Sequence, residues 1–180
     1  KIVSAINAYL RGGVAQLDTG FDVRLNILLV SGGLVGFGVL TLMLNRPDAR
    51  NAMSGAMTGA LAQQLASAEL DPAVKCIVLT GAGKGFCAGG DVKGMAASGD
   101  GTVGANTIDG AIHRQRLNQR ATAGKLFKMP KPTLAALPGA AAGAGLSLAL
   151  ACDLRIMASN AILTTAFARV GFSGDYGGTY

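Results

Sequence analysis

Apolar residues along this chain recur either at helical spacing or in short continuous runs, with loops of small residues between them. The clearest helical pattern comprises four apolar residues: Met57, Leu61, Leu65 and Ala68. It follows Ser54, a residue type that commonly caps helix N-termini, so the pattern predicts a helix over residues 54–70. The apolar run at 76–80 predicts a buried strand over 75–80, soon after that helix.

The rest of the chain repeats this alternation of strand, small-residue loop and helix. The patterns predict further helices at 92–95, 108–126 and 146–152, and further strands at 133–137 and 154–158. The small, glycine-rich stretch 97–106 predicts a mobile loop, and the remainder of the chain to residue 180 reads as strand or loop. This organisation indicates an α/β fold, in which ligand-binding loops follow the carboxyl ends of strands.

Residues 25–44 contain no charged side chain and are about long enough to cross a bilayer. Glycines within this stretch favour a hairpin instead, with strands at 26–30 and 38–44 and a Ser-Gly-Gly turn after the first strand. A membrane-spanning or signal segment is the alternative interpretation. The first 24 residues carry no recognisable motif, so we divide the chain into a segment of unknown role, 1–24, and a core, 25–180.

The composition is that of an ordinary globular domain, with 50% hydrophobic and 14% charged residues in a chain of 180. A net charge of +6 favours an anionic partner, yet the basic residues near His113 fit the solvated face of a helix. Without a basic cluster, we expect no nucleic-acid binding. The cysteines, Cys76, Cys87 and Cys152, match no metal-binding or CxxC spacing, so we expect free thiols, no metal and a cytoplasmic protein.

Two loops made mostly of glycine and alanine follow strands and precede helices. The first, at 83–91, reads Gly-Lys-Gly-Phe-Cys-Ala-Gly-Gly-Asp, and the second, at 138–145, reads Pro-Gly-Ala-Ala-Ala-Gly-Ala-Gly. A backbone with few side chains can approach a ligand closely and direct its N–H groups at it, and a helix N-terminus favours an anion. One donor from each loop would form an oxyanion hole for a carbonyl oxygen. Tight, close-packed turns are the alternative explanation.

Several short motifs, these loops among them, occur in a fixed order along the chain. They are Leu44-Asn45-Arg46-Pro47, Ala52, Phe86-Cys87-Ala88-Gly89-Gly90-Asp91, Lys131-Pro132, the second loop, Ala151-Cys152-Asp153-Leu154-Arg155 and Gly177-Gly178-Thr179. As a set, over roughly residues 25–180, they resemble the enoyl-CoA hydratase/isomerase (crotonase) family. The resemblance implies a spiral of repeated ββα units that binds an acyl-CoA thioester and stabilises its enolate. Coenzyme A would be part of the substrate, and no separate cofactor is expected.

The resemblance also implies roles for individual residues. The backbone amides of Ala88 and Ala144 would form the oxyanion hole. The substrate-binding positions would be Ala49, Arg50, Ala88, Gly89, Gly90, Asp91 and Ala144. Of these, Ala49 and Arg50 would lie near the nucleotide end of coenzyme A, whose phosphates suit a basic chain.

The chain departs from the family where its hydratases have two catalytic glutamates, because these positions are Ser147 and Phe167 here. Neither side chain can act as a carboxylate general acid or base. Asp175, in a segment that borders the acyl pocket in the family, is the candidate catalytic residue, and a turn aspartate bonding local amides is the alternative. Asp91 fits a structural role in the first loop, and Glu69 fits the solvated face of a helix.

Two other interpretations of function follow from the same residues. The segment Gly145-Leu146-Ser147-Leu148-Ala149 is close to the G-x-S-x-G motif, which with His113 as base would make a serine hydrolase. The chain could instead be a non-catalytic acyl-CoA-binding or assembly subunit. Hydration, isomerisation and hydrolysis of an acyl-CoA all stay open as the reaction.

Family members continue beyond the point matching residue 180, as helices that complete the core and form trimers. The resemblance therefore implies a homo-oligomer, a trimer or a hexamer. A spiral without those helices is expected to expose apolar surface.

Overall fold

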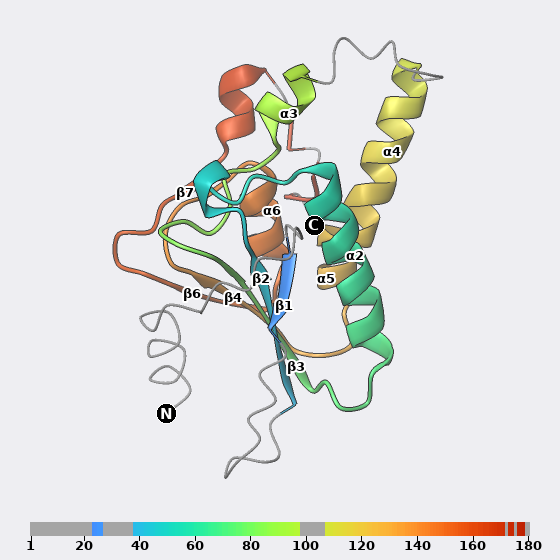
Figure 1. Ribbon diagram of the computed structural model, residues 1–180, viewed down its shortest axis with the longest axis vertical. Coiled ribbons are helices and arrows are strands. Elements are labelled where there is room, and N and C mark those ends of the chain that lie inside the picture. The colour runs from blue at the N-terminus through green and yellow to red at the C-terminus, as the bar shows by residue number, and fades with distance from the viewer. Residues whose placement is uncertain (1–22, 27–37, 98–106, 172, 175, 179–180) are drawn as a thin grey trace.

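The computed structural model describes residues 23–26, 38–97, 107–171, 173–174 and 176–178. Within them, five strands form one sheet in the order β1-β2-β3-β4-β6 (Figure 1). Its strands are β1 (Val23–Asn26), β2 (Val39–Leu44), β3 (Cys76–Gly81), β4 (Thr133–Leu137) and β6 (Leu154–Met157). β1 pairs antiparallel with β2, and the other neighbours pair parallel. The predicted α/β class is confirmed.

Helices connect the parallel strands, because parallel neighbours need crossover connections. The helices are η1 (Pro47–Ala49), α2 (Gly55–Leu70), α3 (Val92–Ala97), α4 (Ile108–Ala121), α5 (Ala123–Phe127), α6 (Ala144–Ala151) and η2 (Ala166–Val170). α2, α4 and α5 lie together beside the sheet, on the right in Figure 1. A second, two-stranded parallel sheet pairs β5 (Ala141–Ala142) with β7 (Leu163–Thr164).

The helix predicted over residues 54–70 is confirmed as α2. The Ser54 hydroxyl accepts a hydrogen bond from the Met57 amide at 3.2 Å, which caps the helix. The four apolar residues of the predicted pattern are all buried: Met57, Leu61, Leu65 and Ala68. Truncating one of the leucines to alanine would cost about 2–5 kcal/mol. At the other end of α2, the Lys131 ammonium donates to the carbonyls of Ala68 and Asp71.

The single helix predicted over 108–126 is wrong, because the chain forms two helices with a break at Thr122. This residue has φ −117° and ψ −87°, outside the helical region, and its side chain is fully buried. Its hydroxyl donates to the Asn118 carbonyl at 2.7 Å, which competes with continuation of the helix. Helix periodicity alone carries no information about such a break.

The predicted hairpin is confirmed in its antiparallel pairing, and its first strand is described only in part. β2 begins at Val39, one residue after the predicted start, and its antiparallel partner is β1, with Val23 opposite Leu44 and Asn26 opposite Thr41. Of the predicted first strand, 26–30, only Asn26 is described. Residues 27–30 and the Ser-Gly-Gly turn lie outside the described residues. In the described part of the chain, no helix has the length and apolar character that crossing a bilayer requires.

The central strand of the main sheet and its edge strand β6 differ in burial. Nearly every residue of β3 is buried, whereas all four residues of β6 are exposed, including Leu154 at 66%. Ile156 and Met157 of β6 are exposed as well, as are Leu150 near the end of α6 and Ile162 and Leu163, which follow β6 in the chain. The expected exposed apolar surface is therefore present at this edge of the sheet.

Candidate functional site

The two glycine-alanine loops pack directly against each other. The amides of Phe86 and Cys87 donate to the Ala140 carbonyl at 3.0 and 3.2 Å, and the Ala142 amide donates to the Cys87 carbonyl at 2.9 Å. A Cβ added at Gly145 would lie 2.4 Å from the Cys87 carbonyl oxygen, so only glycine permits this approach. The structure thus brings together the two loops that the sequence singled out.

Asn51 connects the first loop to the turn that follows β2. Its side chain is fully buried and its φ of 56° is left-handed, a conformation that asparagine adopts more readily than most residues. Its amide nitrogen donates to the carbonyls of Ala82 and Gly85 at 2.9 and 3.0 Å, and its oxygen accepts from the Arg46 amide at 2.9 Å. Since every one of these partners is backbone, one side chain fixes the course of the loop.

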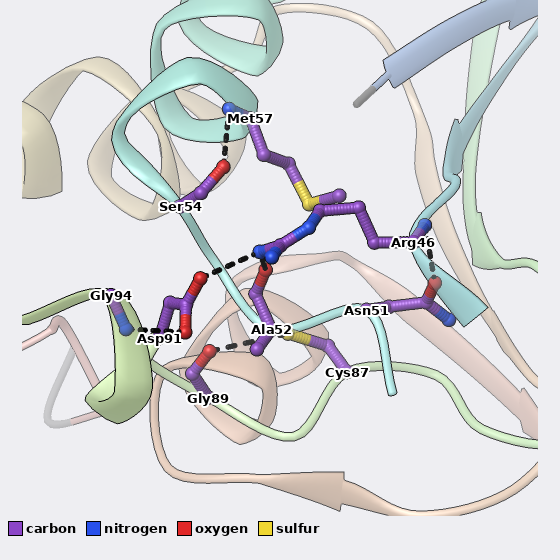
Figure 2. Close-up of polar contacts among 9 residues, drawn as sticks. All are labelled: Arg46, Asn51, Ala52, Ser54, Met57, Cys87, Gly89, Asp91 and Gly94. Atoms are coloured by element: carbon purple, nitrogen blue, oxygen red, sulfur yellow. Dashed lines mark hydrogen bonds and ion pairs between the residues drawn. The ribbon is translucent and has the colours of Figure 1, made fainter. Parts of the chain in front are cut away.

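An ion pair fixes the far end of the same loop (Figure 2). The guanidinium of Arg46 donates to the Asp91 carboxylate and to the Ala52 carbonyl, both at 2.9 Å. The other Asp91 oxygen accepts from the Gly94 amide at 3.0 Å, in the first turn of α3. The Gly94 amide and the Arg46 guanidinium hold the pKa of Asp91 below its usual range. The predicted structural role of Asp91 is confirmed, and the residue also caps α3.

The Ala88 amide has a partner inside the protein, contrary to the expectation that it faces a ligand. It donates to the Arg50 carbonyl at 3.0 Å. The reason is the turn at residues 50 and 51, where left-handed φ values of 52° and 56° direct the Arg50 carbonyl at the first loop. This bond occupies the amide that the sequence assigned to the oxyanion hole.

Several other loop amides have no backbone acceptor among the described residues, and those of Gly90 and Ala144 are among them. Gly90 forms an isolated parallel bridge with Met53, in which the Gly89 carbonyl and the Asp91 amide bond to Met53 at 2.7 and 3.2 Å. In such a bridge the flanking groups face the partner, so the Gly90 N–H points away from it. No feature of the sequence distinguishes Gly90 from Ala88 in this respect.

Ala144 is the first residue of α6, directly after the N-cap residue Gly143, whose φ is 52°. Its N–H is one of the donors that a helix N-terminus leaves without an intrahelical partner. A Cβ added at Gly89 would lie 3.5 Å from the Ala144 nitrogen, so the two loops meet at this donor. Gly89 has φ 101° and is buried, which explains glycine at this position.

The predicted coenzyme A positions lie on the turn that contacts the first loop. Ala49 ends η1 and is partly buried, while Arg50 is exposed. The Arg50 carbonyl accepts a hydrogen bond from the Ala88 amide, so the Arg50 backbone lies directly beside the first loop. Their role towards a nucleotide stays a prediction.

The residues at the two glutamate positions of the family, and the acidic residues of the chain, lie in separate surroundings. Ser147 is 1% exposed and its hydroxyl donates to the Gly143 carbonyl at 3.4 Å, and Phe167 is partly buried in η2. Asp153 accepts from the amide and hydroxyl of Thr133 at 2.7 and 2.8 Å, a structural role. Asp175 lies outside the described residues. Glu69 pairs with Lys125 and is partly buried, rather than lying on a solvated face.

The serine hydrolase interpretation finds no matching pair of side chains in the described residues. His113 is exposed on α4, whereas Ser147 is buried in α6, and no hydrogen bond joins them. A serine nucleophile needs a base within hydrogen-bond reach. His113 is therefore not placed as that base.

The three cysteines are free, and burial raises the pKa of Cys87 to about 11 and that of Cys152 to about 12. Both thiols are therefore protonated and unreactive near neutral pH. In the described part of the chain, no group of three or more His, Cys, Asp and Glu side chains could hold a metal ion.

Sequence reasoning missed one buried polar residue next to the site, Tyr176. Its side chain is 7% exposed and belongs to the same buried cluster as Cys87 of the first loop. Its hydroxyl lies 3.0 Å from that of Thr122, at the break between α4 and α5. A helix break at a threonine leaves no clear signal in sequence, so the contact could not be predicted.

Comparison with known proteins returns one family. The family model described as Enoyl-CoA hydratase/isomerase matches residues 36–180. The chain is 40% identical to the 1,2-epoxyphenylacetyl-CoA isomerase of Escherichia coli (strain K12), over 79% of this chain and 53% of that protein. It is 38% identical to "Enoyl-CoA hydratase domain-containing protein 2, mitochondrial" of Mus musculus, over 79% of this chain and 45% of that protein.

Solved structures agree with these sequence matches. The crystal structure of an enoyl-CoA hydratase from Bacillus anthracis superposes with a TM-score of 0.67 at 27% identity, covering 87% of this chain and 55% of that one. The fold is therefore the crotonase fold, as predicted. The chain spans about half the length of the curated relatives it matches.

Proposed function

The chain belongs to the enoyl-CoA hydratase/isomerase family, and we propose that it binds an acyl-CoA thioester and stabilises the thioester enolate between its two glycine-alanine loops. The observation that carries this proposal is the pair of backbone amides, Gly90 and Ala144, which have no acceptor among the described residues. Each comes from one of two loops that are in direct contact.

The chemistry follows from where negative charge develops. Removing a proton from the carbon next to a thioester carbonyl, or adding a nucleophile to the conjugated double bond, moves charge onto the carbonyl oxygen. Two fixed N–H donors stabilise that oxygen more in the transition state than in the ground state. The α6 N-terminus adds the positive end of its dipole at Ala144.

We assign the first donor to Gly90 and not to Ala88, because the Ala88 amide already donates to the Arg50 carbonyl. Asp91 keeps its structural place through Arg46, and Gly89 keeps the backbone close to Ala144. Arg50 and Ala49 are proposed to border the nucleotide end of coenzyme A. The positive net charge supports a phosphate-bearing ligand.

The proton-transfer group is proposed to be Asp175, since serine and phenylalanine occupy the positions of the family's glutamates. Isomerisation needs one group that moves a proton between two carbons, whereas hydration by this family uses two carboxylates. The single candidate acid therefore favours isomerisation. Asp175→Asn should lower turnover of an enoyl-CoA panel while thioester binding is kept, and equal rates would exclude Asp175.

The absence of both glutamates also favours a second candidate, a non-catalytic acyl-CoA binder. Both functions need the thioester site, and they differ only in turnover. Binding by calorimetry with no turnover of any enoyl-CoA, in wild type and Asp175→Asn alike, would favour the binder.

Ala144→Pro tests the oxyanion site directly. Proline is tolerated at the first position of a helix and removes only the N–H in question. We expect α6 to be kept and turnover to fall about 10²–10³-fold, while the control Ala144→Gly, which keeps the N–H, stays near wild type. Circular dichroism and thermal melting monitor folding. No thioester binding by the wild type at millimolar ligand would contradict the whole proposal.

A further inference from the structure

The C-terminal turn containing Tyr176 packs on the loops of the proposed site, although its residues come more than thirty positions after the second loop. Tyr176 is 7% exposed. Its ring is part of the buried cluster that includes Cys87 of the first loop and Ala141 of the second. One aromatic side chain therefore contacts the core on which both loops rest.

The Tyr176 hydroxyl has defined partners on two helical segments. It lies 3.0 Å from the Thr122 hydroxyl, which is itself 2.7 Å from the Asn118 carbonyl. A threonine hydroxyl carries a single hydrogen and a carbonyl only accepts, so Thr122 donates to Asn118 and accepts from Tyr176. The Thr58 hydroxyl of α2 is a second partner of the Tyr176 oxygen.

Burial raises the pKa of Tyr176, and its hydrogen bonds with Thr122 and Thr58 oppose that shift. The hydroxyl is therefore a neutral donor and acceptor near neutral pH and takes no part as a base. Its two bonds join α2 to the break between α4 and α5. A buried network in which every hydroxyl has a hydrogen-bond partner holds Tyr176 in one position.

Two residues after Tyr176, the backbone reaches the first turn of α6. A Cβ added at Gly178 would lie 3.1 Å from the Ser147 hydroxyl oxygen. Both the amide and the hydroxyl of Ser147 donate to the Gly143 carbonyl, at 3.1 and 3.4 Å. Gly143 is the residue that precedes the Ala144 amide.

We propose that Tyr176 is a positioning residue of the thioester site: its hydroxyl, bonded to Thr122 and Thr58, fixes residues 176–178 against Ser147 and so directs the Ala144 amide at the thioester oxygen. The inference rests on the proposed function, because it assigns a role within that same site. It accounts for a hydroxyl at a buried position where phenylalanine would fill the same volume.

Tyr176→Phe removes the hydroxyl and leaves the ring. Its matched control is Thr133→Val, which also removes one buried hydroxyl, with its two hydrogen bonds to Asp153, at the end of β4 opposite the second loop. Both variants should remain folded and bind cinnamoyl-CoA with Kd within about threefold of wild type. A donor displaced by a fraction of an ångström loses much of its effect, so kcat should fall on the order of 10-fold in Tyr176→Phe alone.

The spectrum of bound cinnamoyl-CoA separates positioning from mere stability. Donors on the thioester oxygen polarise the conjugated carbonyl and shift its absorbance to longer wavelength. Tyr176→Phe and Thr122→Val should each lose part of that shift. The double variant should lose no more than either single variant, because both remove the same interaction. Thr122→Ser, which keeps the hydroxyl, should show the full shift of the wild type. Thr133→Val should keep the full shift.

The outcomes distinguish the two levels of the proposal. If wild type binds and shifts the probe but Tyr176→Phe and Thr122→Val behave identically to it, the positioning role is wrong and the thioester site stands. If wild type neither binds nor shifts cinnamoyl-CoA, the proposed function itself is wrong, and this role with it. Should Tyr176→Phe fail to fold, the Thr122→Val and Thr122→Ser pair decides the question.

Discussion

The two glycine-alanine loops meet at one site but are stabilised by different means. The first is fixed by side chains of a distant turn, through Asn51 and through the pair of Arg46 with Asp91. The second has no polar side chain of its own and is fixed through its backbone. There, the Ala141 and Gly143 amides donate to the carbonyls of Ile162 and Thr164 at 2.9 and 3.1 Å.

This difference determines how each loop can be disturbed. Changes of polar side chains should loosen the first loop in graded steps, because each removes particular hydrogen bonds. The second loop offers no such side chain, so only added volume or a removed N–H can alter it. In a site assembled from both loops, substitutions in the first loop should have graded effects, whereas substitutions in the second loop should be poorly tolerated.

The largest expected effect is that of Gly145→Ala in the second loop. The new Cβ would lie 2.4 Å from the Cys87 carbonyl oxygen and 2.6 Å from the Cys87 Cβ, so the loops must separate. We expect the free energy of unfolding to fall by about 3 kcal/mol or more, with loss of thioester binding. Urea unfolding and calorimetry measure the two effects.

Gly59→Ala is the matched control for that substitution. Gly59 lies in α2 and a Cβ there meets nothing within 4 Å. Alanine should raise the free energy of unfolding by up to about 1 kcal/mol, through helix propensity. Equal responses of the two glycines would mean that the close approach of the loops is not as described.

The second effect, smaller in size, is that of Asn51→Asp in the first loop. Aspartate keeps the shape and tolerates the left-handed φ, but it removes two donors and faces the carbonyls of Ala82 and Gly85 with a carboxylate. We expect a loss of about 2–3 kcal/mol in the free energy of unfolding at neutral pH. Asn160→Asp, at an exposed position, should change the free energy of unfolding little. Similar losses in the two variants would argue against the role of the Asn51 side chain in holding the first loop.

The smallest effect is expected from Asp91→Asn, and it depends on pH. The Asp91 pKa is lowered in the folded state, so its stabilisation is complete above the ordinary aspartate pKa of about 3.9 and is lost as the pH falls through the folded-state value. Wild type should therefore be the more stable protein at neutral pH, and the difference should shrink on acidification. Thermal melts from pH 7 to pH 2 measure it.

Asp48→Asn, at an exposed position of η1, serves as the control for this pH series. If Asp91→Asn and wild type differ by the same amount at every pH, the Asp91 carboxylate does not carry the stabilisation. The ion pair of Arg46 with Asp91 would then be a surface contact without consequence for the first loop.

Local features of the fold could be predicted because their causes are local. The N-cap at Ser54 and the buried face of α2 depend on residues within a few turns of one helix, and the structure has both. The break at Thr122 could not be predicted, since a buried contact with Tyr176 lies 54 residues away in sequence. Residues 23–25 of β1 were missed for the same reason, because strand pairing is decided between segments and not within one.

The features of the candidate site also separate into those that depend on local sequence and those that depend on contacts between distant segments. The sequence by itself determined where the two loops lie and that they are nearly free of side chains, because glycine and alanine have this property in any fold. Only the tertiary structure decided which loop amides already have an acceptor within the protein. The Ala88 amide has one because a left-handed turn directs the Arg50 carbonyl at the first loop, and the Gly90 amide points away from its bridge partner Met53. Backbone donors are the same at every residue, so only their partners in space distinguish them.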